Sequence, residues 1–176
     1  MLNPKTNTRE LAYVVNIDAI EPILGSDNCE CAIVGGWHVM VRKNEFKAGD
    51  PAIYFEIDSY LDPSNSAFSF MEKKKYKVKT QRYTFGGKGN FISQGLLMSA
   101  ANFGWTICKK NNDNLTDIIV GIVDDKDCYH WTNNESRFLT KQLGVTYAVP
   151  EDNTRKAASA DKYKKMAQRH GKLFSH

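Results

Sequence analysis

The sequence predicts a mainly β fold: a five- or six-stranded barrel, followed by short helices and a basic C-terminal helix. Several short runs in the first 105 residues alternate apolar and polar side chains, as half-buried strands do. Glycine-rich turns separate these runs. Helical segments do not alternate with them, so the pattern of a parallel α/β sheet is missing. The length of 176 residues suits one domain with an appendage.

The first three expected strands follow one another closely. Residues 9–23 alternate apolar and polar side chains and end at the turn-forming segment 25–28. Residues 29–34 and 37–41 predict two more strands. The pair Gly35-Gly36 between them is the two-residue turn of a β-hairpin.

Three further strands complete the expected barrel. Residues 52–57 form an apolar strand, and residues 58–72 a long loop with at most one helical turn. Residues 76–85 predict a strand with one cationic face, residues 86–89 a turn, and residues 91–98 the returning strand. Closing such strands into a barrel removes exposed edges. The oligonucleotide/oligosaccharide-binding (OB) barrel is the first candidate for five strands, and a β-sandwich is the alternative.

The character of the sequence changes after residue 106. Residues 115–121 and 138–145 predict two short helices, each stopped by glycine. A polar linker leads to a basic helix over residues 160–170, capped by Ser159. We therefore expect an OB-like barrel domain (1–105), a helical or loop extension (106–150), and a basic linker and helix (151–176).

Two dense basic clusters lie behind the modest net charge of +4. Residues 71–90 hold seven basic side chains against one acid, and residues 154–172 hold seven more against one. Removing these 14 cations and two acids from the totals of 24 and 20 leaves 10 and 18, a net charge of −8. Cations concentrated on an acidic body favour a local anionic partner. Two solvated cationic faces are the alternative.

The residues indicate neither a metal site nor a self-sufficient active site. The four cysteines form no Cys-x-x-Cys pair, so reduced thiols are favoured over zinc binding. The turn at residues 86–89 lacks the spacing of a phosphate-binding P-loop, and no Gly-x-Ser-x-Gly or His-Glu-x-x-His sequence occurs. We predict no catalytic residue and no metal ligand. Without an apolar run of about 20 residues or a signal region, we expect a cytoplasmic protein with no membrane partner.

Five short motifs occur in a fixed order along the chain. They are Ile20–Asp27, Val34–Val41, Phe46–Asp50, Tyr54–Ser59 and Ile92–Leu97. Together they resemble the N-terminal OB domain of the ATP-dependent RNA ligases of the Deinococcus type, the RNA ligase 5 family. The resemblance covers roughly residues 9–105 and continues more loosely beyond them.

The resemblance implies a function for the module and a limit to it. In that family the OB domain precedes a nucleotidyltransferase domain, whose Lys-x-Asp-Gly-type lysine takes AMP from ATP. The full enzyme uses a divalent metal and seals a 3′-hydroxyl to a 5′-phosphate at nicks, a reaction of RNA repair. This chain has no such motif, since Lys126-Asp127-Cys128 departs from it. The resemblance therefore implies an OB module, inactive alone, that positions a nicked RNA or RNA/DNA duplex for a catalytic domain in cis.

The first basic cluster supplies the candidate nucleic-acid contacts. Lysine and arginine give salt-dependent, sequence-tolerant phosphate affinity, and aromatic rings stack on bases. The phosphate candidates are Lys73, Lys74, Lys75, Lys77, Lys79, Arg82 and Lys88. The stacking candidates are Tyr76, Tyr83 and Phe91, each of which could instead belong to the core.

Two other functions fit the same sequence. The module could dock within a ligase, or stand alone as an OB protein, without nucleic-acid affinity of its own. It could also be a truncated relative that competes with the ligase.

Overall fold

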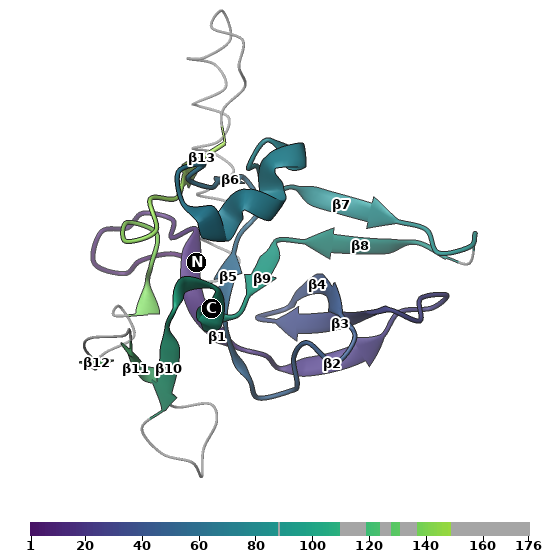
Figure 1. Ribbon diagram of the computed structural model, residues 1–176, viewed down its shortest axis with the longest axis horizontal. Coiled ribbons are helices and arrows are strands. Elements are labelled where there is room, and N and C mark those ends of the chain that lie inside the picture. The colour runs from purple at the N-terminus through teal and green to yellow at the C-terminus, as the bar shows by residue number, and fades with distance from the viewer. Residues whose placement is uncertain (88, 110–118, 124–127, 131–136, 149–176) are drawn as a thin grey trace, which may run out of the picture.

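The computed structural model describes residues 1–87, 89–109, 119–123, 128–130 and 137–148 (Figure 1). The described elements are antiparallel strands and two 3-10 helices, labelled η1 and η2. The prediction of a mainly β chain is therefore confirmed. The predicted helix over residues 160–170 lies outside the described residues.

The first predicted strand is confirmed but is shared between two sheets. Strand β1 (Ala12–Asn16) pairs with β5 (Pro51–Phe55), and β2 (Ala19–Pro22) pairs with β3 (Cys29–Val34). The backbone between β1 and β2 is held by Ile17, whose N–H donates to the carbonyl of Asp50 at 2.9 Å. The run therefore turns a corner from one sheet into the next.

The predicted hairpin at Gly35-Gly36 is confirmed. Strand β4 (Trp37–Arg42) pairs antiparallel with β3, with Val34 opposite Trp37. The two glycines have φ values of 53° and 85°. Positive φ at both central residues is the requirement of the type I′ turn, which matches the twist of the strands.

The predicted strand over residues 91–98 is wrong in one respect, because it is two strands. Strand β8 (Phe91–Gln94) pairs with β7 (Thr80–Tyr83), whereas β9 (Leu96–Met98) pairs with β5. Gly95 separates them with φ 102°, a conformation that glycine adopts without strain. The two strands therefore pair with different neighbours.

The predicted strand over residues 76–85 is also shorter than expected. Only Thr80–Tyr83 pairs as a strand. Residues before it bond elsewhere: the N–H of Val78 donates to the carbonyl of Ser59, and its carbonyl accepts from Asp58. Tyr60 forms an isolated bridge with Lys77. This part of the chain thus belongs to β6 (Ser59–Tyr60) rather than to the hairpin.

The predicted long loop over residues 58–72 contains a 3-10 helix instead of a single turn. Helix η1 (Ser66–Lys74) is capped by Asn65, whose side-chain oxygen accepts from the N–H of Ala67 at 3.0 Å. The helix buries Phe68 and Met71, and Phe68 meets Phe55 edge to face at 5.5 Å. Burying a side chain of this size contributes about 2–3 kcal/mol to the stability of the fold. The local sequence pattern does not show that Phe68 is buried.

The predicted helices over residues 115–121 and 138–145 are wrong. Strands β10 (Thr106–Lys109), β11 (Ile119–Val123) and β12 (Cys128–His130) form an antiparallel sheet. Residues 115–118 lie outside the described part. Because strands pair through distant segments, short apolar runs of this kind do not distinguish strand from helix.

The segment after residue 137 makes a turn where a helix was predicted. Phe138 bridges to Tyr13, and the N–H of Leu143 donates to the carbonyl of Leu139 at 2.9 Å. Strand β13 (Thr146–Tyr147) then pairs with β6. The segment therefore makes a turn between its bridge to β1 and its pairing with β6.

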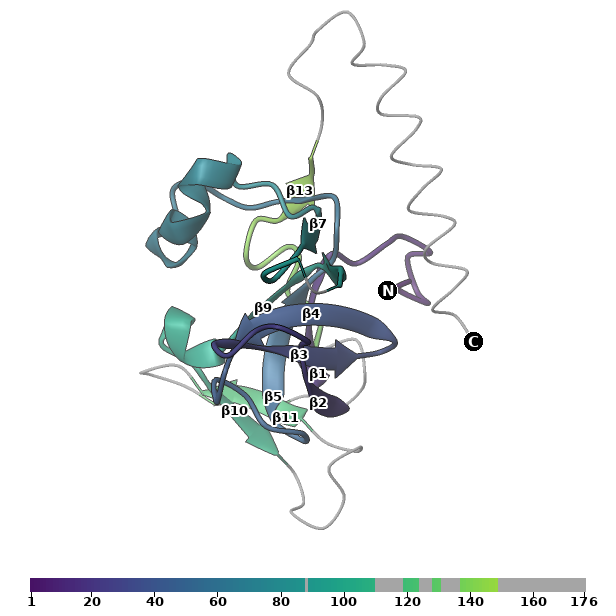
Figure 2. The same ribbon diagram turned by 90° about the vertical axis from the view of Figure 1, so that its right-hand side faces the viewer.

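Two hydrophobic cores lie on the two sides of the β1–β5–β9 sheet. Ile53 and Phe55 belong to the core that also holds Phe68 of η1, whereas Ala52 and Tyr54 belong to the core shared with the β2–β3–β4 sheet. Figures 1 and 2 show these strands from two directions. The described strands form five separate sheets, so their ladders do not close into one continuous barrel. Between β4 and β8, the N–H of Met40 donates to Ser93 Oγ at 2.9 Å.

Helix η2 (Ala100–Phe103) follows β9 and extends the first core with Ala100 and Phe103. No helix in the described ranges is long and apolar enough to cross a membrane.

Candidate nucleic-acid interface

The end of η1 gathers most of the predicted phosphate contacts. Lys73 and Lys74 lie in the last turn of η1, and Lys75 and Tyr76 then take the left-handed conformation, with φ 54° and 60°. This reversal sends the chain towards β7. Five lysines and one glutamine therefore line a single hollow of about 430 Å³. They are Lys73, Lys74, Lys75, Lys77, Lys79 and Gln81.

The lysine-lined hollow carries uncompensated positive charge. Among the residues that the structure describes, no acid forms an ion pair with any of these five lysines. Four of the five are exposed, and Lys77 is half-buried. Lys74 is exposed by area, yet partial desolvation of its ammonium lowers its pKa. Like charges within a Debye length of about 8–10 Å repel one another, and a bound anion would relieve that repulsion.

Part of this charge also has a structural explanation. Lys73 and Lys74 lie at the C-terminal end of η1, where the helix dipole is negative and cations stabilise the helix. Lys77 and Lys79 have no such role, because they lie beyond the end of η1. These two lysines most clearly distinguish an anion-binding surface from an ordinary helix end.

The structure places Arg82, one of the other two predicted cations, away from the hollow. Along β7, Gln81 and Tyr83 are half-buried, whereas Thr80 and Arg82 are exposed. Since successive strand residues point to opposite faces, Arg82 lies on the face of the hairpin opposite to Gln81. Lys88 lies outside the described residues.

The three aromatic candidates lie in two places, because Tyr76 packs at the core whereas Tyr83 and Phe91 share one face of the hairpin. Tyr76 packs against the core beneath η1, so it is a core residue in part. Tyr83 stacks on Phe85, with ring centroids 6.2 Å apart and planes at 14°, and its hydroxyl donates to Gln81 Oε1. Phe91 is half-buried opposite Tyr83 in the hairpin. The predicted stacking surface is therefore not one continuous platform.

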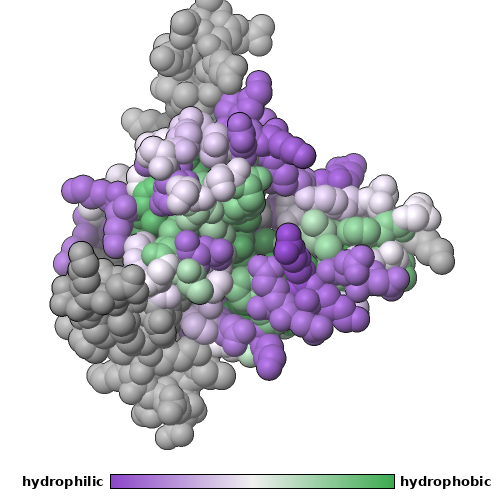
Figure 3. Space-filling model, viewed as in Figure 1, coloured by the Kyte–Doolittle hydropathy of each residue, from purple (hydrophilic) through white to green (hydrophobic). Residues whose placement is uncertain are grey.

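In Figure 3, hydrophilic side chains gather at the end of η1 and the beginning of β7. Along the β7–β8 hairpin the same view shows a more hydrophobic strip. The surface thus changes from hydrophilic at the end of η1 to more hydrophobic along the hairpin.

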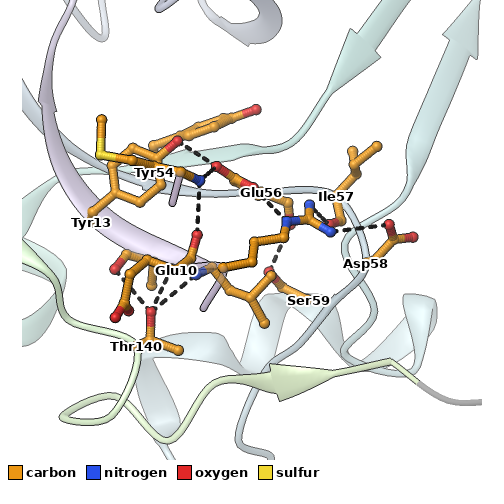
Figure 4. A network of polar contacts seen from close by, with 12 residues as sticks. Glu10, Tyr13, Tyr54, Glu56, Ile57, Asp58, Ser59 and Thr140 are labelled. Atoms are coloured by element: carbon orange, nitrogen blue, oxygen red, sulfur yellow. Dashed lines mark hydrogen bonds and ion pairs between the residues drawn. The ribbon is translucent and has the colours of Figure 1, made fainter. Parts of the chain in front are cut away.

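A buried ion pair, which the sequence reasoning missed, holds the backbone beside the lysines. Glu56 has 0% exposure, and its Oε1 accepts from Arg9 Nε at 2.7 Å (Figure 4). Its Oε2 accepts from the Tyr13 hydroxyl at 2.6 Å and from the Met1 ammonium. Arg9 also donates to the carbonyl of Ile57 at 2.7 Å. The signal in the sequence was an acid within the apolar run Ala52–Ile57.

Charge in this network is set by competing effects. Burial raises the pKa of Glu56, but the Met1 ammonium and the Arg9 guanidinium outweigh it, so the pKa lies below its usual value. Burial lowers the pKa of the Met1 ammonium, although Glu56 opposes the change. We assign Glu56 as a carboxylate at neutral pH, because the Arg9 guanidinium alone places a permanent cation beside it.

The network leads directly to the hollow. The Arg9–Glu56 pair fixes residues 56–59, and Ser59 Oγ donates to the carbonyl of Glu56 at 2.7 Å. In the same segment, the N–H of Asp58 donates to the carbonyl of Val78, and the carbonyl of Ser59 accepts from the N–H of Val78. Val78 lies between Lys77 and Lys79 in the sequence. The buried ion pair therefore positions two of the five lysines.

Metal ligation has no support in the described part of the chain. No group of three or more His, Cys, Asp or Glu side chains there could hold a metal ion. Cys29 and Cys31 are free thiols.

Comparison with protein families identifies the family to which the fold belongs. A family model described as the PHA02142 OB-fold domain matches residues 11–100, just over half of the chain. The chain belongs to this OB-fold domain family. The OB fold predicted from the strand pattern is thereby confirmed. No curated protein matches the sequence.

Solved structures similar to this OB-fold protein are RNA ligases of Naegleria gruberi. The RNA ligase with PPi matches 84% of this chain and 37% of its own, at 26% identity and a TM-score of 0.55. A mutant with AMP and Mn matches 81% and 36%, at 26% identity and 0.54. Another mutant, with ATP and Mn, matches 83% and 37%, at 25% identity and 0.51. The chain thus spans just over a third of the length of these ligases, and the predicted similarity to RNA ligases is confirmed.

Proposed function

We propose that this chain is the OB module of an RNA ligase of the Deinococcus type, the RNA ligase 5 family. It binds a nicked or broken duplex of RNA, or of RNA and DNA, and positions it for ATP-dependent joining of a 3′-hydroxyl to a 5′-phosphate. A nucleotidyltransferase domain in cis performs the sealing, and ATP and a divalent metal act there. The likeness to Naegleria gruberi RNA ligases, some of them with AMP or ATP and Mn, supports this assignment.

The observation that carries the proposal is the hollow lined by five lysines that no described acid neutralises. Phosphates are the anions that an RNA ligase must hold. Each phosphate contact by a lysine releases counterions, so the affinity falls steeply with salt. Arg82 and Lys88 stay in the proposal as further contacts with the same strand, and Tyr76, Tyr83 and Phe91 as candidate stacking residues.

The division of the chain also belongs to the proposal. Residues 1–105 form the OB-like domain, residues 106–150 an extension, and residues 151–176 a basic segment leading towards the catalytic domain. The cytoplasm is the compartment in which we place RNA repair by this ligase.

Fluorescence polarisation with a labelled nicked duplex tests the proposal. We expect binding at about 50 mM salt, and an affinity about 500-fold lower at 200 mM if all five lysines contact phosphates. The triple variant Lys73→Glu, Lys75→Glu, Lys79→Glu should bind much more weakly at the lower salt concentration.

A matched variant distinguishes the effect of the hollow on binding from the effect of net charge. Arg42→Glu, Lys43→Glu and Lys47→Glu together remove the same charge from exposed positions at and after the end of β4. This variant should retain most of the affinity. Absence of binding by the native chain at about 50 mM salt would favour a docking module without nucleic-acid affinity. Equal losses in both triple variants would assign the binding to net charge alone.

A further inference from the structure

A second hollow lies where the turn after β2 meets the tip of the β7–β8 hairpin. Its volume is about 240 Å³. Figure 1 shows the hairpin beside the β2–β3–β4 sheet. The two loops approach closely, since a Cβ on Gly25 would lie 2.7 Å from the carbonyl oxygen of Phe85. We call this hollow the loop pocket; its principal lining residues are Glu21, Ile23, Cys31, His38, Phe85 and Phe91.

The loop pocket has an apolar closed end and a polar open side. Ile23 and Cys31 are buried, and Phe85 and Phe91 contribute half-buried rings. Burial, and next the nearby Glu21 carboxylate, raise the pKa of the Cys31 thiol, which is therefore uncharged at neutral pH. Glu21, His38 and Asn90 are exposed and line the same pocket, so they supply hydrogen-bonding groups at its opening.

The charge of the lining selects the kind of ligand. No lysine or arginine among the described residues lines the loop pocket, whereas Glu21 does. A phosphate would be repelled there, and an uncharged planar group would not. The volume is below the roughly 300–1,000 Å³ of pockets for drug-sized ligands. The pocket therefore suits one ring system rather than a whole nucleotide.

One row of side chains joins the lysine-lined hollow to the loop pocket. Lys79 and Gln81 line the hollow, the Tyr83 hydroxyl donates to Gln81, and Tyr83 stacks on Phe85. Phe85 lines the loop pocket. From residue 79 to residue 85 an extended chain covers about 20 Å. That length fits within a single-stranded site, for which OB folds use about 4–16 nucleotides.

We propose that the loop pocket takes one unstacked nucleobase from the strand whose phosphates lie in the lysine-lined hollow. The path of that strand rests on the proposed function. Phe91 and Phe85 flank the base, and the exposed Glu21, His38 and Asn90 meet its hydrogen-bonding edge. An apolar protein side chain is a weaker candidate, because Gln81, Tyr83 and Phe85 connect the pocket to the lysine-lined hollow and the pocket opens between polar groups.

Two strands of equal charge test the inference on the full chain. One is an RNA of about ten nucleotides, and the other has the same backbone with abasic sites throughout. In polarisation measurements at about 50 mM salt, the native chain should bind the base-bearing strand at least about fivefold more tightly. Phe91→Leu keeps an apolar side chain but removes the ring, so it should weaken binding of that strand only.

Two control variants distinguish binding in the loop pocket from binding in the lysine-lined hollow. Ile92→Ala removes an exposed side chain from the other face of β8, where 42% of Ile92 is exposed, and should leave both affinities unchanged. Lys77→Gln with Lys79→Gln should weaken the binding of both strands to the same extent. Equal binding of the two strands by the native chain would overturn the pocket inference and leave the proposed function standing.

A direct titration covers the case in which neither strand binds and the proposed function fails. Free adenosine, cytidine, guanosine and uridine are added to ¹⁵N-labelled protein, and the amide signals of His38, Gly89 and Phe91 are followed. Shifts with any nucleoside that vanish in Phe91→Leu support the pocket. Amides that respond to none of the four would overturn the proposal.

Discussion

The ring of Tyr54 occupies the space that a side chain at position 95 would need. A Cβ on Gly95 would lie 2.7 Å from Tyr54 Cζ, and the Tyr54 hydroxyl donates to the carbonyl of Gln94 at 2.8 Å. Gly95 also has φ 102°. This contact sits where the strand pairing changes, so β8 can join the hairpin while β9 pairs with β5. The hairpin whose tip lines the loop pocket, and whose Gln81 lines the edge of the lysine-lined hollow, therefore depends on it.

Replacing this glycine should cost considerable stability. Gly95→Ala combines backbone strain with a clash against a buried ring, and we expect a loss of about 2–4 kcal/mol in the free energy of unfolding. Urea denaturation measures it. Gly36→Ala is the control, since Gly36 has φ 85° but no atom within 4 Å of the added Cβ. Equal losses in the two variants would show that strain alone accounts for the effect.

The buried ion pair predicts an asymmetric response to substitution. Arg9→Met leaves the Glu56 carboxylate buried without its guanidinium, so we expect a loss of about 3–5 kcal/mol in the free energy of unfolding. Arg42→Met, at an exposed position, should change it by less than about 0.5 kcal/mol. Chemical denaturation of both variants at neutral pH provides the comparison. A loss below 1 kcal/mol for Arg9→Met would mean that Glu56 is not held as a buried carboxylate.

The lowered pKa of Glu56 predicts a specific acid sensitivity. A depressed pKa in the folded state adds stability that is complete above the unfolded value, near 4.5, and is lost as the pH falls through the lower folded value. The free energy of unfolding should thus decrease below about pH 4.5 in the native chain. Glu56→Gln should be less stable at neutral pH but show a shallower decrease. Parallel pH profiles for the two proteins would contradict this assignment.

The lysine-lined hollow predicts a measurable change in salt dependence. Each phosphate contact contributes about 0.7–0.9 to the slope of log Kd against log salt concentration. Lys77→Gln with Lys79→Gln should therefore reduce that slope by about 1.4–1.8, with a nicked duplex as ligand. The pair Lys43→Gln and Lys47→Gln, in the loop after β4, should leave it unchanged. A slope that both pairs reduce equally would place the bound phosphates elsewhere.

Local sequence chemistry predicted the parts of the fold that depend on neighbouring residues. Gly35-Gly36 determines its hairpin because two adjacent residues must both have positive φ. The alternation in residues 9–23 likewise marks a half-buried strand, whatever its partner. By contrast, the strand β11 at Ile119–Val123 and the helix η1 at Ser66–Lys74 could not be recognised, because distant pairing and core packing decide them.

The candidate site divides in the same way. The sequence by itself determined that seven cations lie within residues 71–90 and that the chain resembles RNA ligases. Only the tertiary structure decided which of them meet, because the left-handed residues Lys75 and Tyr76 reverse the chain after η1. It placed five lysines around one hollow and Arg82 on the other face of β7. Charge is a property of composition, whereas the distance between charges depends on backbone turns that distant contacts such as Val78 with Ser59 hold in place.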